Sequence, residues 1–194
     1  ASNSITAFSR DDTTGLLTLD TVATHGVGGV DGLRSVSGMM ADAQSRNLYA
    51  AGQTDAAVAV FRLPAPSVTV SSVAVLSYSS GAPALVIDNA LTVDDPFSAT
   101  LASARISVSA GFVAGDVLSV TTSGAVTSSY DNATGVLTLS GTDTLSAYQA
   151  VLRAVGFRST ATDATNGGLS SSRTIAFTVT NGSSGSAAAT RSDW

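Results

Sequence analysis

Apolar and polar residues alternate with a period of two along much of this chain, which is the pattern of β-strands that bury one face. The alternation is clearest at 102–110, where Ile106 and Val108 alternate with Ser107 and Ser109, and at 173–180. Short strands separated by turn residues predict an all-β protein. The pattern predicts strands at 5–9, 16–24, 33–40, 47–51, 56–63, 68–75, 84–86, 102–110, 117–121, 126–129, 136–140, 155–158 and 173–180.

One stretch departs from this alternation. Between 143 and 153, Leu145, Tyr148 and Leu152 recur at i, i+3 and i+7, which places them on one face of a helix. Asp143 or Thr144 precedes that face and can cap the helix. We therefore expect one short helix that bridges two sheets at one end of a sandwich.

A nine-residue phrase occurs twice, as DDTTGLLTL at 11–19 and as DNATGVLTL at 131–139. Asp, Asn and Thr supply side-chain hydrogen bonds for a turn, and Gly supplies the positive φ that ends a hairpin loop. Each copy follows one predicted strand and begins the next. The phrase therefore predicts two β-hairpins of one kind.

A second repetition and a proline-rich stretch divide the chain. The strand phrase ITAF at 5–8 recurs as VAVF at 58–61, 53 residues later, close to the period of about 40 to 50 residues of propeller blades. Pro64-Ala65-Pro66 predicts a stiff linker, because proline cannot donate to a ladder and presets an extended path. The predicted parts are a blade-like antiparallel sheet at 1–63, a linker at 64–67, a β-sandwich at 68–180 and a Ser/Gly/Ala-rich tail at 181–194.

The tail ends in Trp194, the only tryptophan of the chain. Its small polar composition favours an ordinary disordered terminus. The alternative is that the tail pairs with a neighbour.

Four stretches in order carry a family pattern: TAFSRD at 6–11, TGLL at 14–17, GVGGVDGLRSV at 26–36 and NLYAAG at 47–52. With them, the first segment resembles the lactonase-type β-propeller repeats of bacterial surface proteins, except that ADAQSR at 41–46 replaces the usual Ser-Pro-Asp-Gly turn. A propeller needs four to eight blades, and one blade leaves both faces of its sheet uncovered. The resemblance implies that the second segment, a copy from another chain or blades outside this sequence cover it.

The second segment carries a longer series of matches, at 91–95, 98–104, 111–118, 134–141, 145–152 and 173–179. With them, residues 84–180 resemble the cadherin-like, immunoglobulin-fold repeats of large bacterial secreted and surface proteins. This resemblance and the strand pattern together predict an immunoglobulin/cadherin-like β-sandwich with a short helix.

The amino-acid composition limits the classes of partner that the chain is suited to bind. All fourteen acidic residues are Asp and all nine basic residues are Arg, which favours strands joined by Asp-bearing loops over exposed helices. A net charge of −5 disfavours nucleic acid and anionic membranes as partners, because both require a basic patch. No apolar run is long enough to span a membrane, and the absence of cysteine excludes disulfides and thiol catalysis.

Calcium is the cofactor that the resemblance raises, because cadherin-like modules are stiffened by carboxylates in their loops. Asp94, Asp95 and Asp163 are the predicted ligands, with Asp116 and Asn166 as further oxygen donors. The related loops read Ser/Asp-Asp-x-Asp, and here Phe97 replaces the last acid. A solvated turn without a metal is the favoured interpretation.

Catalytic patterns are weak. His25 is the only histidine, and no G-x-S-x-G motif accompanies it, so a surface loop is the favoured interpretation of this residue. The glycines between 26 and 32 lack the lysine and the following helix of a phosphate cradle. The adjacent pairs at 11–12 and 94–95 do not form an acid/base couple, because neighbours in a strand point in opposite directions.

These observations predict a non-catalytic structural or adhesive module, extracellular or at a cell surface, whose partners are other copies of itself or neighbouring repeats of a larger protein. Unpaired strand edges of the lone blade predict assembly, in one form as a fibre built by strand addition. The alternatives are a fragment of a lactonase-type propeller hydrolase and a calcium- or carbohydrate-binding module.

Overall fold

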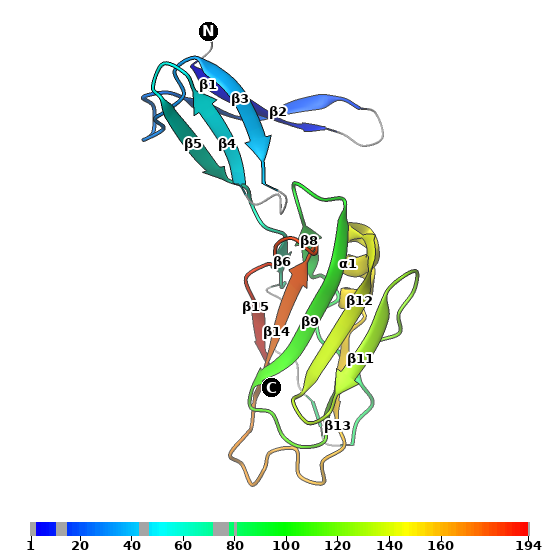
Figure 1. The fold of residues 1–194 in the computed structure, drawn as a ribbon. Helices are drawn as coiled ribbons and strands as arrows, with labels where there is room; N and C mark the ends of the chain where they lie inside the picture. Colours follow the sequence, from blue (N-terminus) through cyan, green and yellow to red (C-terminus); the bar gives the residue numbers. More distant parts are fainter. Residues whose placement is uncertain (1–2, 11–14, 43–46, 72–77, 80, 194) are drawn as a thin grey trace. The chain divides into compact units, whose positions relative to one another are not determined.

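The computed structural model describes residues 3–10, 15–42, 47–71, 78–79 and 81–193. The chain divides into two compact units, Ala1–Pro64 and Ala65–Trp194, here called unit 1 and unit 2. The division falls inside the predicted linker. Each unit is described by itself. In both units nearly all regular structure is β-strand, as the alternation predicts (Figure 1).

Unit 1 contains the five predicted strands, with ends that differ from the prediction by three residues or fewer. Strands β1 (Ser4–Arg10) and β2 (Leu17–Thr24) form an antiparallel hairpin. Strands β3 (Val36–Ala41), β4 (Asn47–Gly52) and β5 (Ala57–Arg62) form an antiparallel sheet in that order (Figure 1). Strand β3 begins later than predicted, because Gly32 and Ser35 adopt positive φ and hold residues 32–35 in a turn.

The core of unit 1 is small. Ile5 from the hairpin, Leu33 from the turn and Ala50 from the sheet are its buried apolar side chains among the described residues. Six partly buried residues surround them: Ala23, Val30, Val36, Leu48, Ala59 and Phe61. The hairpin and one face of the sheet therefore pack together, and that face is called the inner face below. The blade-like sheet predicted from the sequence is thus a hairpin packed on a three-stranded sheet.

Unit 2 is built around a five-stranded antiparallel sheet with the order β11-β12-β9-β14-β15 (Figure 1). A three-stranded sheet, β10-β13-β7, and a two-stranded sheet, β6-β8, accompany it. The bounds are β6 Ser67–Thr69, β7 Leu85–Val86, β8 Thr92–Asp94, β9 Thr100–Ala110, β10 Asp116–Ser119, β11 Thr127–Asp131, β12 Val136–Thr144, β13 Gly156–Ser159, β14 Arg173–Thr180 and β15 Ala189–Asp193. Residues 72–75 of the strand predicted at 68–75 lie outside the described residues.

The sheets of unit 2 enclose one continuous core. Its largest fully buried side chains include Tyr148, Phe157 and Phe177. Strand β9 alternates as predicted, since Ile106 and Val108 point into this core. The core contains nineteen buried residues, from Val68 to Val179, in the part of the chain that the structure describes. Unit 2 is therefore a β-sandwich whose stability rests on apolar burial.

The predicted helix is confirmed as α1 (Leu145–Arg153). Thr144 is its N-cap, because its hydroxyl accepts a hydrogen bond from the backbone N–H of Ala147 at 3.2 Å. The helix buries Tyr148, Val151 and Leu152, and the Tyr148 hydroxyl donates to the carbonyl of Gly141 at 2.6 Å. The start of the helix and the buried tyrosine hydroxyl therefore each have a hydrogen-bond partner, while the apolar side of the helix closes the core.

The second copy of the nine-residue phrase forms the predicted hairpin between β11 and β12. Asp131 accepts hydrogen bonds from the Ala133 backbone N–H at 2.9 Å and from the Thr134 hydroxyl at 2.7 Å, and Gly135 adopts a φ of +68°. These bonds, led by that from Thr134, lower the pKa of Asp131. In the first copy, β1 and β2 pair as predicted, although 11–14 lie outside the described residues.

The prediction of a disordered tail is wrong for residues 189–193. Strand β15 pairs antiparallel with β14 at the edge of the five-stranded sheet, from Phe177↔Ala189 to Arg173↔Asp193. Arg191 on this strand is buried beside Asp88. The small polar residues of the tail show no strand pattern, but the segment pairs with a sheet edge and contributes Arg191 to an ion pair within its own unit. Trp194 lies outside the described residues.

Candidate functional site

The structure places the predicted calcium ligands Asp94 and Asp95 at the end of β8. Asp94 is exposed. Asp95 is buried, and its two oxygens accept hydrogen bonds from the Phe97 backbone N–H at 3.0 Å and from the Asn181 side chain at 2.8 Å. Asp95 therefore closes its own turn and anchors the start of the tail.

Asp163, the third predicted ligand, lies in the exposed loop before β14. Its carboxylate accepts from the backbone N–H and hydroxyl of Thr165 at 2.8 and 2.6 Å, and from the Gly167 N–H at 2.7 Å. These bonds, led by that from the Thr165 side chain, lower its pKa. Across the described ranges, the structure brings no three His or Asp side chains together as metal ligands. Asp94, Asp95 and Asp163 thus belong to two separate turns.

A buried ion pair joins Asp116 at the start of β10 to Arg173 at the start of β14. The Arg173 Nε and Nη2 atoms donate to the two oxygens of Asp116 at 2.6 and 3.2 Å. The remaining guanidinium N–H groups donate to the carbonyls of Ala164, Ser170 and Ser172. Because every side of the guanidinium has a partner, this arginine holds the loop that precedes β14.

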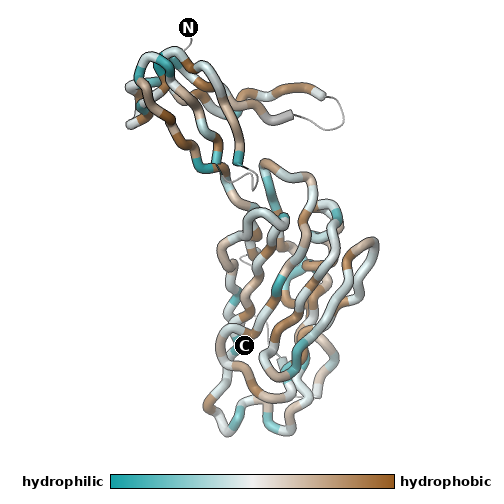
Figure 2. Tube along the Cα trace, viewed as in Figure 1, coloured by the Kyte–Doolittle hydropathy of each residue, from teal (hydrophilic) through white to brown (hydrophobic). Residues whose placement is uncertain are grey.

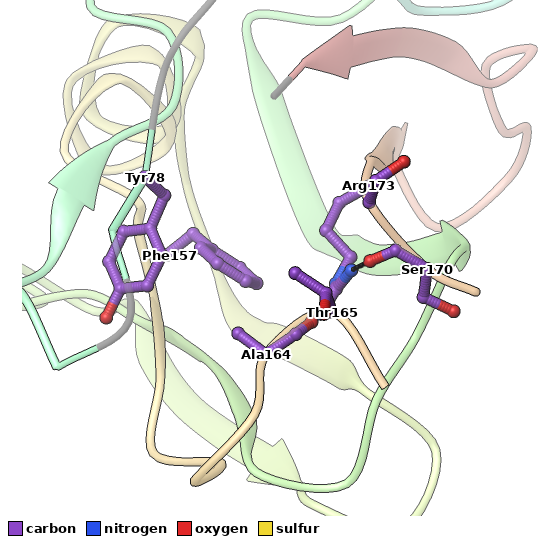
Figure 3. Close-up of a pocket in the computed structure, with 7 residues that line it drawn as sticks. Tyr78, Phe157, Ala164, Thr165, Ser170 and Arg173 are labelled. Atoms are coloured by element: carbon purple, nitrogen blue, oxygen red, sulfur yellow. Dashed lines mark hydrogen bonds between the residues drawn. The ribbon is translucent and has the colours of Figure 1, made fainter. Parts of the chain in front are cut away.

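Arg173 also lines a small cavity of about 60 Å³, with Tyr78 and Phe157 opposite it (Figure 3). The two aromatic rings meet edge to face, with centroids 5.3 Å apart. The other lining residues are Ala164, Thr165, Ser170 and Ser171. This volume is well below the roughly 300 to 1,000 Å³ of sites that bind drug-sized ligands. Sequence reasoning missed the Asp116–Arg173 pair, because 57 residues separate its members.

A second buried ion pair joins Asp88 and Arg191, whose Oδ2 and Nη1 atoms lie 3.6 Å apart. Burial opposes ionisation of Asp88, but hydrogen bonds from the Ser71 hydroxyl, the backbone of Ser71 and Ala90, and the charge of Arg191 outweigh it. The pKa of Asp88 therefore lies below its usual value. This pair attaches the last strand to the sandwich.

His25, the predicted surface histidine, is mostly buried in unit 1. Its Nδ1 atom lies 3.5 Å from Asp55 and 3.9 Å from Asp31, with no hydrogen-bond partner among the described residues. Asp55 also accepts from the Arg34 backbone N–H at 2.9 Å. The glycines that follow His25 form tight turns and lead into β3, so the described residues of this loop offer no helix N-terminus for an anion.

The most unusual surface of the molecule is the side of the three-stranded sheet opposite its inner face. The register places Met40, Tyr49 and Val60 in one row across β3, β4 and β5, and Ala51 and Val58 in the next. We call these five residues the outer face. Met40, Val58 and Val60 are 69%, 60% and 57% exposed. Ten of the thirteen exposed large apolar side chains of the described residues lie in unit 1.

The hairpin of unit 1 carries a second exposed apolar surface. Phe8 pairs with Leu19 and Arg10 with Leu17, while Thr6 pairs with Val22, so these positions share one side of the hairpin. We call Phe8, Leu17, Leu19 and Val22 the hairpin face; all four side chains are exposed. Figure 2 shows the hydrophobic positions along both strands. Unit 1 therefore has an uncovered apolar surface on both sides of its small core.

The fold defines an all-β chain with a β-sandwich unit, and comparisons with known proteins add one relative. No family model matches the chain, and no solved structure matches it. Over an aligned stretch of 111 residues, the chain is 41% identical to Halomucin of Haloquadratum walsbyi. The aligned stretch covers 53% of this chain and 1% of that protein. The chain thus spans only about one hundredth of the relative's length. None of the described helices has the length and apolar character to cross a membrane.

Proposed function

We propose that this chain is a non-catalytic, extracellular structural or adhesive module that associates with further copies of itself. The observation that carries the proposal is the imbalance in unit 1. Its described residues bury three apolar side chains and expose ten large ones. Monomeric proteins rarely leave contiguous apolar surface of this kind uncovered, so it marks an interaction site.

Unit 2 provides the contrast within the same chain. It buries nineteen core residues and exposes three large apolar side chains among those described, namely Val86, Phe97 and Leu169. A unit of this kind supports its own fold and serves as a stable carrier. In the proposal, unit 2 is the cadherin-like, immunoglobulin-fold spacer and unit 1 is the part that associates.

The sheet edges of unit 1 favour the same conclusion. Strand β5 pairs with β4 on one side, and no described strand pairs with its other edge. The same holds for β3. Unpaired edges accept strands from other chains, which is the route by which strand addition builds fibres. The similarity to a small part of a very long protein named Halomucin is in line with a module of an extended extracellular assembly.

Mass measurement over a wide concentration range tests self-association. Light scattering after size-exclusion chromatography should give a mass that rises above that of one chain, and negative-stain images should show elongated particles. Leu169→Asp is the matched control, because Leu169 is exposed on unit 2 and its replacement should leave the mass unchanged. A mass of one chain at every concentration would contradict the proposal.

Labelling of intact cells tests the proposed location. Antibodies raised against the purified chain should bind the surface of unpermeabilised source cells or material in their medium. Signal that requires permeabilisation would show that the protein acts elsewhere.

A further inference from the structure

The repeated strand phrase has a structural counterpart. The phrase at 5–8 lies in β1 and its copy at 58–61 lies in β5, so Ile5 corresponds to Val58 and Ala7 to Val60. Ile5 is buried, with 9% of its surface exposed, whereas Val58 is 60% exposed. Two equivalent positions of one repeat therefore differ because one is covered and the other is not.

Unit 1 itself shows what covers this kind of surface. Ile5 belongs to the cluster with Leu33 and Ala50, and the inner face of the sheet supplies Ala59 and Phe61 to the same cluster. The side of β1 that contains Ile5 and the side of β5 that contains Ala59 and Phe61 therefore contribute to the same core. The outer face contains Val58 and Val60, which are the repeat equivalents of Ile5 and Ala7. A partner for the outer face should therefore present a surface equivalent to that of Ala59 and Phe61.

The chain carries that surface as well, and it is uncovered. Ala59 corresponds to Thr6 and Phe61 to Phe8. Phe61 is partly buried in the core, whereas Phe8, at the equivalent position on the hairpin face, is 52% exposed. The hairpin face is thus the surface that, by the repeat, should cover the outer face.

Deepening the self-association proposed above, we infer that the outer face of one copy packs on the hairpin face of a second copy. The contact between chains would resemble the packing of hairpin and sheet in the core of unit 1, with the roles of β1 and β5 exchanged. Because the two surfaces differ, each copy retains one open surface after pairing, and association continues head to tail. This inference rests on the proposed function and specifies its partner.

Two variants that block one surface each test the inference. Val60→Asp places a charge on the outer face, and Phe8→Asp places one on the hairpin face, in both cases at a side chain more than half exposed. Each variant alone should have the mass of one chain, since every contact needs both surfaces. An equimolar mixture should give twice that mass, because the outer face of Phe8→Asp remains able to bind the hairpin face of Val60→Asp.

Circular dichroism checks that each variant is folded. Val60→Thr retains a branched side chain suited to a strand, so it should weaken assembly less than Val60→Asp. If wild type assembles and both Asp variants assemble equally well, the contact lies elsewhere, for example at strand edges; the inference then fails while self-association stands. If Phe8→Asp alone still forms a dimer, two outer faces pair with each other and the inference is overturned. A wild type that is monomeric throughout overturns both proposals.

Discussion

At the scale of single residues, buried charges organise unit 2. Asp116 and Arg173 are fully enclosed, and the guanidinium donates to the carboxylate and to three backbone carbonyls. A buried pair adds little net stability over an apolar packing, but removal of one partner leaves the other charge uncompensated. The pair therefore specifies where the loop before β14 attaches.

We expect Asp116→Asn to lower the free energy of unfolding by about 3 to 5 kcal/mol, because Arg173 remains buried without its counter-charge. Urea unfolding followed by circular dichroism measures the change. Asp94→Asn is the control, since Asp94 is exposed and surface substitutions change stability by less than about 0.5 kcal/mol. Equal effects of the two substitutions would show that the buried pair is unimportant.

Asp88 gives unit 2 a dependence on pH. Its pKa is lowered in the folded protein, so the stability it contributes is fully present above its ordinary pKa of 3.8 and is lost as pH falls through the folded value. In Asp88→Asn the unfolding free energy should therefore fall less steeply below pH 4 than in wild type. Urea titrations at a series of pH values provide the comparison, and identical slopes would exclude this role.

At the scale of elements, the local features of the sequence predicted most of the strands and the helix. The helix cap, the Asp131–Gly135 turn and the alternation in β9 each depend on residues within a few positions of one another. Such signals can be recognised in a single sequence because the interacting residues lie close together along the chain.

Elements fixed by distant partners could not be predicted in this way. Strand β15 has a small polar sequence, and its order comes from the free edge of β14 and from Asp88, far away along the chain. Asp95 is a similar case, because its side-chain partner Asn181 lies 86 residues away along the chain. The spacing of residues along the sequence does not reveal which distant residues pair with one another.

The N-cap of α1 offers a test at this scale. Thr144→Ala removes the acceptor for the Ala147 N–H and should lower the unfolding free energy by about 1 kcal/mol. Thr144→Ser keeps the hydroxyl and should retain most of the stability. Chemical denaturation of the three proteins distinguishes them, and an alanine variant as stable as wild type would show that the cap contributes nothing.

At the scale of the whole molecule, the two units differ in the apolar surface that each buries. Among the described residues, unit 1 buries three apolar core side chains and unit 2 buries nineteen, which predicts that unit 1 unfolds first on heating. Calorimetry of dilute protein should resolve two transitions, and Asp116→Asn should lower only the upper one. A single transition that moves as a whole would show that the units unfold together.

The small core that the described residues of unit 1 form bears on the survival of isolated copies. A unit with so little buried surface opens often, and proteases cleave opened chains. In the assembly proposed above, proteases in the surroundings would degrade copies that fail to find a neighbour, whereas incorporated copies would be protected. The thin core would thereby remove surplus and damaged subunits without any dedicated quality-control factor.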